Sequence, residues 1–351
     1  MSKAAKALQR AEALRLRARY QEALTVLKTL RTRDRALRLR RYLLLGHVQR
    51  MTGAFEASAR AYQKALALAD EPAQRADMLV SLALSRRAQG LWRQALGLLK
   101  EAEHIYRKLR DQEALAFLQW ARGGTWRVRG DISEAIRCFR DALRRFAALA
   151  DEHAVGYCLN GLGGAWRIKG SYRRSHHYYQ RANELFRALR EPFGLAYSHC
   201  GLGNALRMMG QHREALEHFR KALRIYRRIG DITSSSYTLW SMSKTWQLLG
   251  RHRLAERYLQ QAEAHFRQTK DPRGWLYCLL QRAEAAALSK DMGKARRLAQ
   301  EALRRARSLG FSVEACHGRA LLKALQGQQE AGCYKALGLR PLPCTLPLNV
   351  P

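Results

Sequence analysis

Apolar and polar positions alternate along most of the chain with the period of an α-helix, and the helices come in pairs. The clearest pair runs from Gly201 to Asp231, where two amphipathic stretches flank a turn at residues 210–212. Small residues stand where two helices must approach closely, and larger ones fill the space between them (Gly203, Ala215 and Ala222; Leu202, Leu206, Phe219 and Tyr226). This stretch predicts a helical hairpin.

The same hairpin recurs along nearly the whole sequence. Turn glycines follow one another every 40 residues from Gly90 onward (Gly90, Gly130, Gly170, Gly210, Gly250), with Gly53 before them and Lys290 after. A column of acids has the same period (Asp111, Asp151, Glu191, Asp231, Asp271), and so does a column of alanines (Ala102, Ala142, Ala182, Ala222, Ala262, Ala302). Three columns that share one period indicate a repeat protein.

A single hairpin cannot bury its apolar face alone, so such repeats stack on their neighbours. We therefore predict an all-α fold, a right-handed superhelical α-solenoid of about eight hairpins over residues 1–310. Its turns are expected near residues 18, 53, 90, 130, 170, 210, 250 and 290, with Ala18 in the degenerate first turn. A capping helix is expected at 311–328 and an irregular, proline-rich tail at 329–351, whose last part we expect to be disordered.

The residues of the repeat resemble a known family. Leu159, Leu162, Gly163 and Trp166, followed by Ser175, Tyr179 and Ala182, fit the tetratricopeptide-repeat (TPR) pattern, and the resemblance extends over roughly residues 4 to 308. The 40-residue form is similar to the repeats of LGN/Pins-type adaptors, kinesin light chains, Rap proteins and the MalT sensor region. The resemblance implies that the first helix of each unit lines a concave groove.

Composition adds a strong positive charge. The chain has 64 basic and 29 acidic residues, a net charge of +35, which predicts attraction to acidic protein segments, nucleic acid or anionic membranes. The sequence shows neither a long apolar run nor a secretory signal, so we expect a cytoplasmic protein. The seven cysteines are widely spaced, and we expect reduced thiols.

Two columns on the first helices are candidates for the groove. Arginines stand three residues before each turn (Arg50, Arg87, Arg127, Arg167, Arg207), and tyrosines stand thirteen before it (Tyr157, Tyr197, Tyr237, Tyr277). Other side chains lie between them (Trp120, Trp240, Asn160, Asn204, Lys244), and Gly124 and Gly164 would let a ligand backbone approach. The tyrosines fit inter-repeat packing equally well, and the arginines also fit a solvated face.

The family's known ligand residues do not transfer to this chain. By resemblance, the carboxylate clamp of chaperone-binding TPR proteins needs lysines and asparagines, where this chain has Trp120, Asn160 and Cys200 in one column and Gly124, Gly164 and Asn204 in another. LGN-type repeats carry an arginine where Leu195 precedes Ala196 and Tyr197. Neither kind of partner is therefore expected.

We expect no enzymatic activity, no cofactor and no metal site, because no catalytic or ligating set of residues has suitable spacing. The leading hypothesis is a scaffold or adaptor that binds an acidic or extended segment of another protein in a basic, aromatic-lined groove. RNA or single-stranded nucleic-acid binding is the first alternative. A peptide-sensing regulator is the second, and the sequence does not define the oligomeric state.

Overall fold

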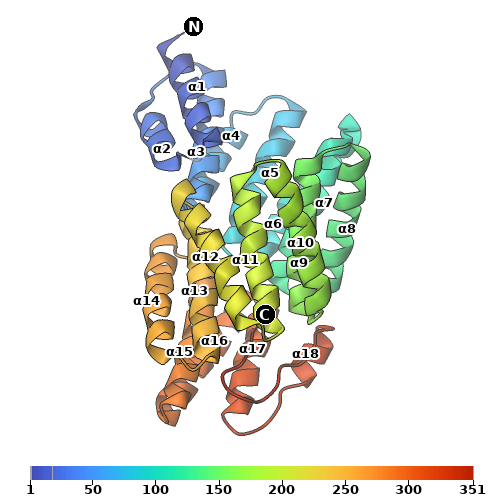
Figure 1. Cartoon of the computed structure of the whole chain (residues 1–351). Coiled ribbons are helices and arrows are strands. Elements are labelled where there is room, and N and C mark those ends of the chain that lie inside the picture. The colour runs from blue at the N-terminus through green and yellow to red at the C-terminus, as the bar shows by residue number, and fades with distance from the viewer. Residues whose placement is uncertain (1, 18, 351) are drawn as a thin grey trace.

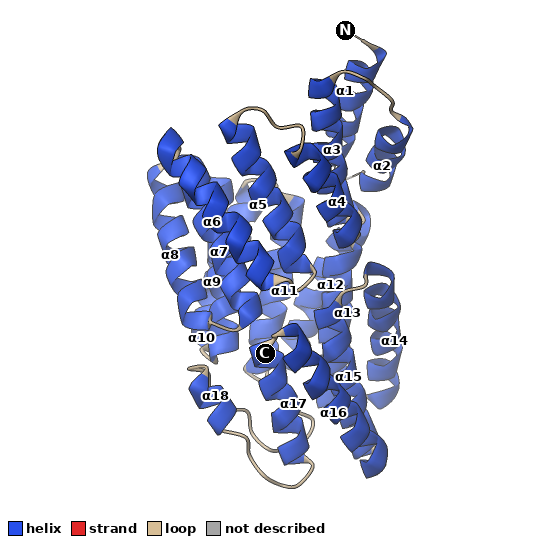
Figure 2. Cartoon of the chain, turned by 180° about the vertical axis from the view of Figure 1, so that it is seen from behind, coloured by secondary structure: helices blue, strands red, loops and turns tan. Residues whose placement is uncertain are grey.

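The computed structural model of the chain describes residues 2–17 and 19–350, and its regular elements are all helices. They form consecutive hairpins stacked side by side (Figures 1 and 2). This confirms the predicted all-α solenoid. The turn expected at Ala18 lies outside the described residues, as do Met1 and Pro351. Among the described helices, none has the length and apolarity needed to cross a bilayer.

In the part of the chain that the structure describes, sixteen helices form the eight predicted pairs, and two more follow them. The pairs are α1 (Lys3–Leu16) and α2 (Tyr20–Thr29), α3 (Arg35–Met51) and α4 (Phe55–Leu66), α5 (Pro72–Ala88) and α6 (Trp92–Leu109), α7 (Gln112–Arg129) and α8 (Ile132–Ala148), α9 (Glu152–Lys169) and α10 (Tyr172–Ala188), α11 (Pro192–Met208) and α12 (His212–Ile229), α13 (Ile232–Leu248) and α14 (His252–Thr269), and α15 (Pro272–Leu288) and α16 (Met292–Leu309). The last two are α17 (Ser312–Ala324) and α18 (Gly332–Ala336).

The repeated columns act at the helix ends. The turn glycines adopt positive φ angles, such as 84° at Gly210, and Lys290 takes the same conformation at 65°. The acids of the second column cap the next helix: Asp111 accepts the backbone N–H of Ala114, and Asp151 that of Ala154, each at 2.9 Å. The acid column therefore marks the start of an inner helix, and the glycine column marks its end.

Glycines in the first helix of a pair allow its partner to pack closely. A β-carbon at Gly203 would lie 2.7 Å from the ring of Phe219 in α12, and one at Gly163 would lie 2.8 Å from the ring of Tyr179 in α10. The middle first helices are buried on most sides, whereas their partners keep one exposed face. The first helices thus form the inner layer of the superhelix and the second helices form the outer layer.

The superhelix closes on itself. Gly53 packs against Thr233 and Thr269, which follow more than four repeats later in the chain. Gly90 packs against the ring of Phe311, and Gly310 lies beside the indole of Trp92. Figure 1 shows the yellow and orange helices α12 to α14 returning to the side of the blue helices α3 and α4. Repeats from the N-terminal and C-terminal parts of the array are therefore in contact, and the array is not an open solenoid.

The C-terminal segment is ordered, so the expectation of a disordered tail is wrong. The prolines keep residues 337–350 out of a helix, but Leu342, Leu348 and Val350 are buried in the main apolar core. The tail carries no charge after Arg340, and burying its leucines and valine removes apolar surface from water. It lies against the solenoid along the backbone contact from Arg340 N–H to the carbonyl of Lys169 (3.3 Å).

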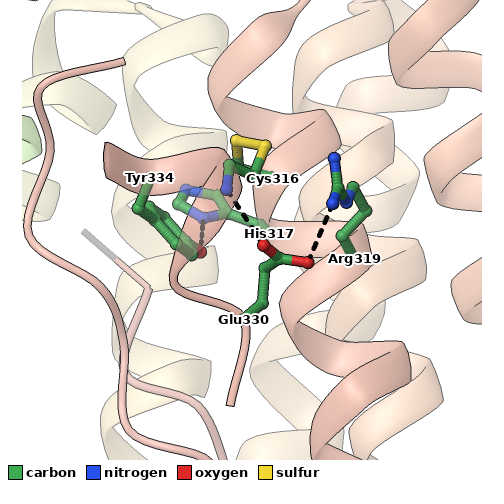
Figure 3. Close-up of a disulfide and its surroundings, with 6 residues drawn as sticks. Cys316, His317, Arg319, Glu330 and Tyr334 are labelled. Carbon is green, nitrogen blue, oxygen red and sulfur yellow. Dashed lines mark hydrogen bonds and ion pairs between the residues drawn. A yellow bond between two sulfur atoms is a disulfide. The ribbon is translucent and has the colours of Figure 1, made fainter. Parts of the chain in front are cut away.

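A disulfide joins α17 to α18, which corrects the expectation that all the thiols are reduced. Cys316 and Cys333 are bonded, while the remaining five cysteines are free (Cys138, Cys158, Cys200, Cys278, Cys344). Beside the bond, the Tyr334 hydroxyl and Nδ1 of His317 lie 2.7 Å apart, and Arg319 pairs with Glu330 at 3.1 Å (Figure 3). This cluster fixes the segment that leads into the tail.

Candidate functional site on the inner face

The arginine column lies along the inner layer, one residue near the end of each of α3, α5, α7, α9 and α11. Arg50, Arg87, Arg127 and Arg167 are half-buried, and Arg207 is fully buried. The solvated-face interpretation is therefore wrong for Arg207. The Nε atoms of Arg50, Arg127, Arg167 and Arg207 are buried without a hydrogen-bond partner among the described residues.

Two of the inner carboxylates are paired with other cations. Lys244 pairs with Glu284, and Arg273 pairs with Glu314 at 2.6 Å. Within the described part of the chain, no arginine of the column forms an ion pair with a carboxylate, so the column carries positive charge at partly buried positions. Burial and then the repulsion of Arg127 and Arg50 lower the pKa of Arg87 to about 9. The arrangement is suited to bind an anion.

Arginines fill the space that we expected to be open. A β-carbon at Gly124 would collide with the guanidinium of Arg87, and one at Gly164 would collide with that of Arg127. Gly124 and Gly164 thus accommodate an arginine of the preceding repeat, and the expectation that they leave room for a ligand backbone is wrong. The arginine column and the glycine column therefore pack against each other in the structure.

Three of the four tyrosines bind the acids that cap the following inner helix or stand in its first turn. The hydroxyls of Tyr157, Tyr237 and Tyr277 donate to Glu191 (3.0 Å), Asp271 (2.9 Å) and Glu314 (2.9 Å). Glu191 and Asp271 also accept backbone N–H groups at the starts of α11 and α15. These bonds link one repeat to the next and favour the inter-repeat packing interpretation for these three side chains.

Tyr197 differs from the other tyrosines. Burial opposes the ionisation of its hydroxyl, but the positive charges of Arg127 and Arg167 outweigh that effect, so the pKa of Tyr197 is lowered. At Tyr179, burial is the dominant effect and raises the pKa, although the same two arginines act to lower it. Tyr197 is therefore the tyrosine of this column that belongs to the basic cluster.

The remaining predicted residues are inside the superhelix too. Trp120 is half-buried, stacks on Phe117 with ring centroids 5.4 Å apart, and donates its indole N–H to the carbonyl of Tyr157. Asn160 is 1% exposed, and neither its amide nitrogen nor its amide oxygen has a partner among the described residues. The amide of Asn160 can therefore donate to a carbonyl and accept from an N–H group of an extended peptide backbone.

The comparison with protein families agrees with this geometry. The family described as "Tetratricopeptide repeat" matches residues 154–228 and 194–268, the stretch that contains α10 to α13. Together the two matches span residues 154–268, about a third of the chain, so the pattern of this family is present within the repeat array. A search of curated protein sequences finds no match.

Solved TPR structures share the fold at low sequence identity. A Rap protein complexed with Competence and Sporulation Factor is 12% identical, with 95% of this chain and 98% of that chain covered and a TM-score of 0.63. The Rap conjugation gene regulator of the plasmid pLS20, in complex with the Phr* peptide, is 17% identical over 80% and 77% of the chains, with a TM-score of 0.67. NprR in complex with its cognate peptide NprX is 13% identical over 76% and 78%, with a TM-score of 0.62.

The inner face changes from glycine to polar and charged residues towards its C-terminal half. The position six residues before each turn is Gly124 and Gly164 in two repeats, and then Asn204, Lys244 and Glu284 in the next three. Asn204, Lys244 and Trp240 are all buried, and the Trp240 ring stacks obliquely on Tyr277 with centroids 4.7 Å apart. Glu284 was not predicted as a site residue, although its place in this column was visible in the sequence.

Proposed function

We propose that this protein is a non-enzymatic TPR adaptor whose inner face binds an acidic, extended segment of a partner protein. The observation that carries the proposal is the column from Arg50 to Arg167, which is partly buried and forms no ion pair with a carboxylate among the residues that the structure describes. Arginine matches the geometry of carboxylates, and such charged hydrogen bonds contribute about 1.5–3 kcal/mol each. Asn160 would bind the backbone of the same segment.

The related structures give specific support to a free peptide as the partner segment. The Rap regulator of pLS20 and NprR were each solved in complex with a peptide. A peptide-sensing regulator and an adaptor for a protein segment use the same chemistry on the inner face. Both belong to this proposal, and they differ in whether the acidic segment is part of a larger chain.

Fluorescence anisotropy with a labelled acidic dodecapeptide tests the proposal. The variant Arg127→Gln/Arg167→Gln removes two inner charges, and the matched control Arg137→Gln/Arg144→Gln removes two exposed charges from α8, whose side chains are 70% and 80% exposed. We expect the inner variant to lose at least 10-fold in affinity, since about 1.4 kcal/mol corresponds to a tenfold change. The control should lose less than threefold.

Equal losses in the two variants would show that only bulk charge attracts the peptide. Nucleic acid is a separate outcome of the same experiment. A single-stranded oligonucleotide that binds more tightly than the acidic peptide, and that depends on Arg127 and Arg167, would replace the adaptor proposal with the nucleic-acid alternative. Each phosphate contact would then add about −0.7 to the slope of log K against log salt.

A further inference from the structure

The end of the tail lies on the inner face in a site formed by α11, α13 and α15, which we call the tail cradle and define by Asn204, Arg207, Lys244 and Glu284. The guanidinium of Arg207 donates to the carbonyl of Val350 (2.9 Å) and to the side-chain oxygen of Asn349. The side-chain nitrogen of Asn349 donates back to the carbonyl of Arg207 (3.1 Å). Glu284 accepts the backbone N–H of Leu348 (3.2 Å).

These contacts are those by which a peptide receptor holds an extended segment. Two of them go to backbone atoms, the N–H of Leu348 and the carbonyl of Val350, and so do not depend on the side chains of the bound segment. The pair of bonds between Asn349 and Arg207 does depend on the side chain, since it needs one acceptor and one donor on the same group. The tail cradle thus recognises backbone atoms of the bound segment and the side chain of one asparagine.

The tail cradle is itself fixed by polar contacts. Lys244 pairs with Glu284 and also donates to Gln247 (3.1 Å), which orients the carboxylate towards Leu348. Arg207 donates to Asn204 (3.2 Å), and Asn204 in turn accepts a hydrogen bond from Ser241 (3.1 Å). The side chains that meet the tail are therefore held in place by neighbours on the solenoid.

The chemistry of the occupant differs from that proposed for the arginine column. Residues 341–350 contain no charged side chain, and the two residues that flank Asn349 are apolar and buried. Lys244 and Glu284 neutralise each other, so no acid is needed beside them. Leu342 and the segment from Leu346 to Val350 contact the solenoid, whereas Pro343, Cys344 and Thr345 between them are exposed.

We propose that the tail cradle is a second peptide-binding site, specific for an uncharged extended segment with an asparagine between apolar residues, and that Leu346–Val350 is its resident occupant. A partner segment of this class binds by displacing the tail. Without an occupant, Arg207 would lose the acceptors that Asn349 and Val350 provide, which favours exchange of one segment for another over an empty site. This inference goes beyond the proposed function and does not require it.

The test uses the full chain and a labelled peptide with the sequence of residues 341–351, in which serine replaces the cysteine. Leu348→Asp places a carboxylate beside Glu284 at a position that is 1% exposed, so the tail of this variant should leave the cradle. We expect the peptide to bind the Leu348→Asp chain at least 10-fold more tightly than the wild-type chain. Thr345→Ala, at an exposed position of the tail, is the matched control and should behave as wild type.

A second peptide separates recognition from general apolar adhesion. The same sequence with alanine in place of asparagine should bind the Leu348→Asp chain at least 10-fold more weakly, because it cannot bond to Arg207. Equal binding of the two peptides, or no binding of either to a variant that melts as wild type does, would overturn the inference. The acidic dodecapeptide should bind wild type and Leu348→Asp with the same affinity. Failure of the tail-cradle proposal can therefore be distinguished from failure of the proposed function.

Discussion

The guanidinium of Arg127 lies over Gly164, in the space that a β-carbon at residue 164 would occupy. The two residues are 37 positions apart and come from consecutive inner helices, α7 and α9. The glycine therefore sets the position of the arginine. The position of a charge on the inner face therefore depends on a packing contact between repeats. A substitution at residue 164 can test this dependence.

Gly164→Ala should change binding more than stability. The tip of Arg127 is flexible and can move away from the new methyl group, so we expect the free energy of unfolding to change by less than about 1 kcal/mol. The displaced guanidinium should reduce the affinity for the acidic dodecapeptide. At Gly97, no atom lies within 4 Å of an added β-carbon, so Gly97→Ala should leave affinity unchanged. Urea unfolding and anisotropy measure the two effects.

Gly203→Ala should instead destabilise the fold. Its β-carbon would lie 2.7 Å from the ring of Phe219 and 3.0 Å from the carbonyl oxygen of Ala215, and neither can move freely. Overpacking of this kind costs about 1–3 kcal/mol. A variant as stable as wild type would show that α11 and α12 can move apart without loss.

Backbone conformation at the repeat boundaries gives a matched pair of variants. Lys270 and Gly230 occupy equivalent positions with φ of 52° and 73°, and nothing lies within 4 Å of a β-carbon at Gly230. Left-handed backbone costs a non-glycine residue about 1 kcal/mol. Lys270→Gly should therefore stabilise the protein by about 0.5–1 kcal/mol, and Gly230→Ala should destabilise it similarly. Changes of the same sign in the two variants would contradict this explanation.

Reduction should loosen the C-terminal segment. The bond between Cys316 and Cys333 closes a loop across 17 residues, and a loop of that size is worth about 3 kcal/mol of stability. Dithiothreitol should lower the melting temperature of the wild-type chain but not that of Cys333→Ser, with Cys344→Ser as the control at an exposed free thiol. Thiol titration of the denatured, unreduced chain should find the five free cysteines, and a count of seven would refute the bond.

Acid should weaken the same region through His317. Burial is the main reason that the pKa of His317 falls to about 4, while the carboxylate of Glu314 opposes the shift. Between pH 6.5 and 4 the unfolded chain binds a proton at this residue and the folded chain does not, so stability falls as the pH falls through this window. The loss is at most about 3 kcal/mol. His317→Gln should flatten this part of the stability profile relative to wild type, and an unchanged profile would rule out this residue.

The repeat was fully visible in the sequence, because turn glycines, caps and small packing residues are each fixed by local backbone geometry. The inner arginines were found for the same reason. Their relation to Gly124 and Gly164 was missed, since it depends on the offset between consecutive repeats, which no single hairpin determines. The order of the tail does not follow from the sequence, because its prolines exclude a helix and the surface that buries Leu342, Leu348 and Val350 comes from distant repeats.

The closed superhelix has a consequence for how the chain unfolds. An open array of repeats can fray from either end, because each unit depends only on its neighbours. Here Gly90 rests on Phe311 and Gly310 on Trp92, so the third hairpin and the C-terminal cap support each other across more than 200 residues of sequence. Removing one terminal repeat would therefore break two interfaces rather than one. Such a chain should melt as a single cooperative unit, because these contacts couple hairpins that are far apart in the sequence.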